Sequence, residues 1–115
     1  MVEGSRIDSG GHQNDTEMVV NEMLDFDRAI KAALDFAETT PNTLVVITAD
    51  HETGGMSLNG GNFETGEVKG AFTTVGHTGV MVPVFAFGTG AKEFAGIYQN
   101  TDLMPKILEL LGINQ

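Results

Sequence analysis

The 115-residue sequence contains no cysteine, and only six of its residues are lysine or arginine. Without cysteine there can be no disulfides and no thiolate metal ligands, so a metal site in this chain would have to use histidine and carboxylate side chains. Sixteen acidic residues outnumber the six basic ones and give a formal net charge of −10. This balance argues against nucleic acids and anionic membranes as partners, because both require a positive surface.

Long apolar runs are also missing, since none approaches the roughly 20 residues of a membrane-spanning helix. Hydrophobic residues nevertheless make up 41% of the chain, which argues against disorder. The length corresponds to about one small domain. A domain of this size is expected to bury a core and to remove roughly two-thirds of its unfolded surface from water.

The pattern of apolar residues predicts an α/β chain. Apolar residues recur at steps of three and four between Val19 and Ala37, which predicts a helix over 16–39 with Asn14 near its cap and an apolar face packed in the core. Continuous apolar runs predict strands at 43–49 and 80–87, of the kind that is buried on both faces of a parallel sheet, with Pro83 favouring an edge. Weaker signals indicate strands at 56–58 and 67–74, and a final helix is expected over 102–111, capped by Asn100 or Thr101 and ended by Gly112.

Met1 and Val2 resemble the end of a strand whose beginning is missing, and residues that look functional follow at positions three to eight. Because chain termini usually fray, this start suggests a fragment of a longer protein. The expected architecture is therefore part of a three-layer α/β/α sandwich.

The three histidines, His12, His51 and His77, all lie in loop-like segments next to expected strand ends. Asp8 stands four residues before His12, and Asp50 directly precedes His51 at the end of the strand at 43–49. Ligand sites gather at the carboxyl ends of strands in open α/β sheets, and imidazole with carboxylate suits zinc. Each histidine could equally be an ordinary surface or hydrogen-bonded residue. The glutamates at 52, 64 and 67 are interpreted as solvated loop charges.

Four segments together resemble the carboxyl-terminal part of the alkaline phosphatase family. They read VEGSRIDSGGH, NTLVVITADHETGG, GHTG and NTDLMPKILELLG, and they cover nearly the whole chain. The resemblance implies an α/β/α sandwich that holds two zinc ions and one magnesium ion and hydrolyses phosphate monoesters. By the same resemblance, Asp8, His12 and His77 would bind the first zinc, Asp50 and His51 the second zinc, and Glu3 the magnesium.

The resemblance also implies that residues 1–115 are the carboxyl-terminal portion of an alkaline phosphatase-like catalytic domain. The serine nucleophile and the phosphate-binding arginine of the family come from the amino-terminal half, so no catalytic residue is assigned in this chain. The isolated chain is therefore expected to be inactive, and the parent to be a periplasmic or extracellular hydrolase. Ser9 is a departure, because several relatives carry a cationic side chain after the aspartate.

A homodimer is a further implication of the family, although the stretch between His51 and His77 is shorter than the insertion that contributes to the dimer surface in some relatives. Two alternatives remain open. One is a metal-dependent phosphodiesterase or phosphomutase of the same superfamily, and the other is a non-catalytic interaction module, with or without one structural metal. The metal content of the purified chain distinguishes the interaction module from a fragment of a catalytic domain.

Overall fold

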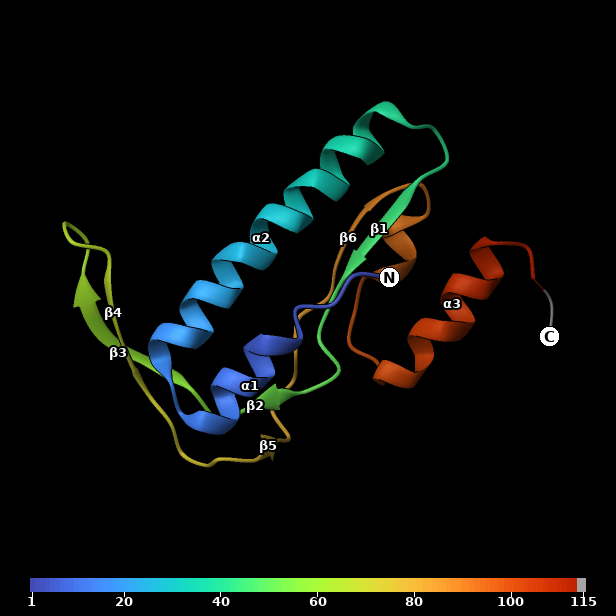
Figure 1. Cartoon of the computed structure of the whole chain (residues 1–115). Helices are drawn as coiled ribbons and strands as arrows, with labels where there is room; N and C mark the ends of the chain where they lie inside the picture. The colour runs from blue at the N-terminus through green and yellow to red at the C-terminus, as the bar shows by residue number, and fades with distance from the viewer. Residues whose placement is uncertain (114–115) are drawn as a thin grey trace. The chain divides into compact units, whose positions relative to one another are not determined.

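The computed structural model describes residues 1–113, and its elements are shown in Figure 1. Two compact units can be distinguished, each built from two stretches of sequence: residues 1–29 with 51–82 form unit 1, and residues 30–50 with 83–113 form unit 2. Within residues 1–113, no helix is both long enough and apolar enough to cross a membrane.

Unit 1 begins with helix α1 (Ser5–Gln13), which the sequence did not predict. Glycine in a helix interior costs about 1 kcal/mol relative to alanine, and α1 contains two, Gly10 and Gly11. Both are buried, so packing stabilises a helix that intrinsic propensity disfavours. The expected strand end at residues 1 and 2 was wrong, because residues 1–4 have no regular structure.

Helix α2 (Thr16–Thr39) has the bounds that the apolar periodicity predicts. The expected cap at Asn14 was wrong by one residue. Asn14 adopts a left-handed backbone, φ 53°, and ends α1, a conformation that asparagine tolerates better than most residues. The N-terminus of α2 is capped by Asp15, whose Oδ1 accepts a hydrogen bond from the backbone N–H of Met18 at 3.0 Å.

Two antiparallel strand pairs complete unit 1. Strand β2 (Glu52–Thr53) pairs with β5 (His77–Thr78), so that Glu52 lies opposite Thr78 and Thr53 opposite His77. Strands β3 (Ser57–Asn62) and β4 (Glu67–Ala71) form a hairpin. The weak strand signals at 56–58 and 67–74 are therefore confirmed.

Unit 2 contains the strands that the sequence predicts most strongly. Strand β1 (Leu44–Ile47) pairs with β6 (Phe85–Gly88), but the pairing is antiparallel, which corrects the expectation of a parallel neighbour. The strand expected over 80–87 begins only at Phe85. Pro83 has no N–H to contribute to a ladder, and its carbonyl instead accepts a hydrogen bond from Thr48 Oγ1 at 3.1 Å.

The chain continues through two 3₁₀ turns, η1 (Ala91–Phe94) and η2 (Asn100–Asp102), into helix α3 (Leu103–Leu110). This confirms the helix predicted over 102–111, and Gly112 follows it with φ 69°, a left-handed value that glycine adopts without strain. The entry cap differs from the expectation. Asp102 is the N-cap residue of α3 and makes no side-chain capping hydrogen bond there. Its carboxylate instead accepts the N–H of Gln99 at 3.2 Å in the capping box of η2, so neither Asn100 nor Thr101 caps α3.

The expected large core is not present in the described part of the chain. Phe94, at 3% exposure, is the one buried hydrophobic side chain among residues 1–113. Helix α2 has no buried residue, so its apolar face is not enclosed as predicted. Two-stranded sheets offer too little surface to cover both faces of such elements. The apolar side chains left exposed include Met23, Leu24, Phe36, Phe85 and Phe87.

Candidate metal centre

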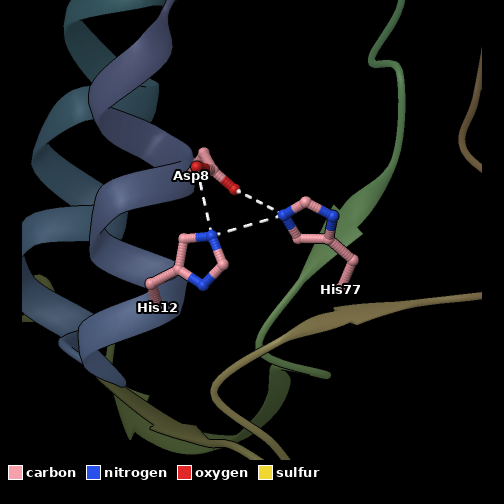
Figure 2. Close-up of side chains that lie close together, drawn as sticks. All are labelled: Asp8, His12 and His77. Carbon is pink, nitrogen blue, oxygen red and sulfur yellow. Dashed lines mark hydrogen bonds and ion pairs between the residues drawn. The ribbon is translucent and has the colours of Figure 1, made fainter.

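Three of the predicted site residues converge in unit 1. Asp8 and His12 lie one turn apart on α1, and His77 lies on β5. Each offers one ligand atom, and these atoms all lie within 4.8 Å of one another. Figure 2 shows the carboxylate and the two rings pointing toward a common point. All three side chains are between 42% and 49% exposed, so the cluster is open to solvent.

The distances within this cluster fit a tetrahedral metal. His12 Nε2 lies 3.3 Å from His77 Nε2 and 3.4 Å from Asp8 Oδ2, while His77 Nε2 lies 3.6 Å from Asp8 Oδ1. Zinc binds nitrogen and oxygen at about 2.0–2.1 Å in a tetrahedron, which sets neighbouring ligand atoms about 3.3–3.4 Å apart. The three side chains could therefore hold a zinc ion with small adjustments.

Close packing of α1 against β2 makes this convergence possible. A Cβ atom at Gly11 would lie 2.7 Å from the Thr53 carbonyl oxygen and 2.9 Å from the Thr53 Cβ. Only glycine at this position lets the helix approach the strand so closely. The approach brings Asp8, one turn earlier on α1, within reach of the Thr53 side chain.

Thr53 orients Asp8 directly. Its hydroxyl donates to Asp8 Oδ1 at 2.6 Å. This hydrogen bond is the largest cause that lowers the pKa of the Asp8 carboxyl below its ordinary value, and the attraction of His12, His77 and His51 acts in the same direction. The carboxylate form that a metal requires is therefore favoured before any metal binds.

A backbone carbonyl orients His12. His12 Nδ1 lies 2.6 Å from the carbonyl oxygen of Val75, and a carbonyl can only accept, so Nδ1 carries the proton. In the neutral ring the lone pair then sits on Nε2, the atom that faces Asp8 and His77. Metal-binding histidines typically use their second nitrogen in this way.

His51 lies beside the cluster. Its ring stacks on that of His77, with centroids 3.5 Å apart and planes inclined by 19°. His51 Nδ1 is 3.2 Å from Thr53 Oγ1. Because the Thr53 proton goes to Asp8, Thr53 Oγ1 accepts from His51 Nδ1, and the Nε2 of a neutral His51 keeps its lone pair.

The other two predicted ligands are not part of this group. Glu3 precedes α1 and lies with Arg6 and Glu22 around a surface hollow of unit 1. Asp50 belongs to unit 2, where its backbone carbonyl accepts a hydrogen bond from Asn100 Nδ2 at 3.0 Å. Among residues 1–113, the group of side chains that could hold a metal ion consists of Asp8, His12 and His77.

Two residues around the centre were misjudged from the sequence. Glu52 was interpreted as a solvated charge, but it is half-buried and accepts hydrogen bonds from the turn that follows it. Thr53 was not singled out at all. The available signal was that Thr53 alternates with Glu52 along a short strand next to His51. The partner of Thr53, Asp8, is 45 residues away in the sequence, so local pattern did not reveal the contact.

We expect Thr53→Val, which keeps the branched shape and removes the hydroxyl, to raise the pKa of Asp8 toward its ordinary value. A lowered carboxyl pKa stabilises the folded chain above the unfolded value of about 3.9, and this stabilisation is lost as the pH falls through the folded value. The variant should lose less stability over that acid range. Carboxyl ¹³C shifts of Asp8 against pH measure the change, with Thr65→Val in the exposed hairpin turn as control, and an unaltered titration would contradict the assignment.

The chain is similar to known phosphatases in sequence and in structure. The family model for alkaline phosphatase matches residues 1–71, more than half of the chain. Alkaline phosphatase 3 of Bacillus subtilis is 30% identical over 99% of this chain and 40% of its own length. Streptomycin-6-phosphate phosphatase of Streptomyces griseus is 38% identical over 97% of this chain and 29% of its own length.

A solved variant of the alkaline phosphatase from the Antarctic bacterium TAB5, with Mg bound in its M3 site, superposes with a TM-score of 0.89. It is 46% identical and covers 98% of this chain, which in turn covers 35% of it. This likeness confirms the predicted α/β fold of alkaline phosphatase type. The chain spans two-fifths or less of the length of these three proteins. The chain belongs to the alkaline phosphatase family.

Proposed function

We propose that this chain supplies a zinc-binding part of the active site of a phosphate monoester hydrolase. The observation that carries the proposal is the convergence of Asp8, His12 and His77. Three protein ligands leave one tetrahedral position open, which is the arrangement of catalytic zinc sites, whereas structural sites are closed by four. Membership of the alkaline phosphatase family supports phosphate monoesters as the substrate class.

The same proposal assigns Asp50 and His51 to a second zinc and Glu3 to a magnesium ion. The position of His51 supports this assignment, because its ring stacks on that of His77, one of the ligands proposed for the first zinc. The magnesium bound to the solved variant of the TAB5 enzyme supports a role for that ion in the family. Two metals held by these residues would act on both ends of an in-line displacement.

A zinc ion at the first site supplies a Lewis acid that stabilises negative charge on the oxygen of the departing alcohol. The residues of this chain prepare the site for it. Thr53 holds Asp8 as a carboxylate, and the Val75 carbonyl holds the proton of His12 on Nδ1. The ligand atoms are thus oriented in advance, which reduces the reorganisation needed when metal and substrate bind.

We place the serine nucleophile outside these 115 residues, so that the complete protein turns over substrate and the isolated chain does not. The test compares hydrolysis of 4-nitrophenyl phosphate by both. The complete protein should be active, lose activity to a chelator and regain it with zinc. Faster hydrolysis of bis(4-nitrophenyl) phosphate would favour a phosphodiesterase, and robust zinc-dependent turnover by the isolated chain would contradict the placement of the nucleophile.

A further inference from the structure

Glu52 occupies a position from which one side chain contacts both the turn after β2 and the end of β5. In the β2–β5 pair, Glu52 lies opposite Thr78, and its neighbour Thr53 lies opposite His77. Successive residues of a strand point to opposite faces. The Thr53 side chain contacts Asp8, while the Glu52 side chain makes a separate set of contacts.

The carboxylate of Glu52 accepts three hydrogen bonds. Oε1 accepts the backbone N–H of Met56 at 3.2 Å, and Oε2 accepts that of Gly55 at 3.1 Å. Oε2 also accepts from the Thr78 hydroxyl. Glu52 is half-buried, so losing these acceptors would leave partly desolvated donors without a partner, which destabilises the turn.

These contacts hold the residues that precede and follow His77 in the sequence. Thr78, the residue after His77, is held by Glu52 directly. Gly76, the residue before it, accepts through its carbonyl the N–H of Gly54 at 2.9 Å, and Gly54 lies within the turn that Glu52 closes. Gly54 and Gly55 have φ of 90° and 59°, left-handed values that glycine adopts readily and that form the turn closed by Glu52.

We propose that Glu52 is a positioning residue that holds His77 within reach of Asp8 and His12. Its functional meaning rests on the zinc site proposed above, but the placement of His77 is a property of the metal-free chain. Glu52 does not contact the metal position itself. It acts through the β2–β5 pair and the turn at residues 52–56.

The test uses the complete 115-residue chain with Glu52→Ala and Glu52→Gln. The matched control is Glu64→Gln, an exposed glutamate at the tip of the β3–β4 hairpin. Two quantities are measured under conditions where circular dichroism shows every variant to be folded. The first is the nuclear Overhauser effect between the rings of His12 and His77, measured without metal. The centroids of these rings lie 5.1 Å apart. The second is the zinc dissociation constant by competition with a chromophoric chelator.

We expect Glu52→Ala to abolish the contact between the rings and to weaken zinc binding about 10-fold, the low end of the range for residues that support metal ligands. Glu52→Gln keeps the size and one acceptor oxygen and should lie between Glu52→Ala and the unchanged control. Retention of both the ring contact and the zinc affinity in Glu52→Ala would overturn the proposal. If the unaltered chain binds no zinc, the proposed function fails, and the ring contact still decides the role of Glu52.

Discussion

Replacing His77 with alanine should remove zinc binding by the chain and lower phosphatase activity of the complete protein by orders of magnitude. The substitution leaves Asp8 and His12 on one helix, and two ligands one turn apart do not define a tetrahedral site. Loss of a residue that merely supports a ligand already costs about 10–100-fold in metal affinity or activity. Removing a ligand itself should cost more.

Stability should change little in the same variant. The His77 side chain is 49% exposed, and exposed substitutions typically change the free energy of unfolding by about 0.5 kcal/mol or less. Val80→Ala, three residues further on and also exposed, serves as control for the loop. Calorimetric zinc titration and 4-nitrophenyl phosphate hydrolysis are the measurements. If His77→Ala keeps the zinc stoichiometry and the turnover of the unaltered protein, His77 is an ordinary surface residue.

Gly11→Ala should disrupt the metal centre without altering any of its ligands. The added methyl group would lie 2.7 Å from the backbone oxygen of Thr53, so α1 has to move away from β2. Better helix propensity contributes about 1 kcal/mol in the opposite direction. Overpacking of this kind costs about 1–3 kcal/mol, and the displacement also breaks the hydrogen bond from Thr53 to Asp8. The clash should therefore outweigh the propensity gain.

Gly79→Ala is a suitable control for this prediction. A Cβ atom at Gly79 meets nothing within 4 Å, and its φ is not left-handed, so the same chemical change fits there without strain. The free energy of unfolding, measured by urea denaturation, and the zinc affinity should both fall for Gly11→Ala and stay unchanged for Gly79→Ala. Zinc binding by Gly11→Ala at the affinity of the unaltered chain would show that α1 and β2 need not approach so closely.

Local sequence patterns predicted α2 and β1, because the signal for each lies within its own segment. The periodic apolar residues of α2 define its bounds, and the apolar run at 43–49 locates β1. Helix α1 was missed, since its stability comes from burial of Gly10 and Gly11 and not from propensity. The late start of β6 depends on Pro83, whose effect on pairing is decided only when a partner strand is present.

By itself, the sequence offered Asp8, His12 and His77 as candidate metal ligands, because residue type limits which atoms can bind a metal and the motifs around them resemble the alkaline phosphatase family. The tertiary structure alone decided which of the predicted residues meet and what supports them. His12 and His77 are 65 residues apart, and the partners of Asp8 and Glu52 lie 45 and 26 residues away. Contacts over such separations depend on how helices and strands pack, and here they depend on the absence of a side chain at Gly11.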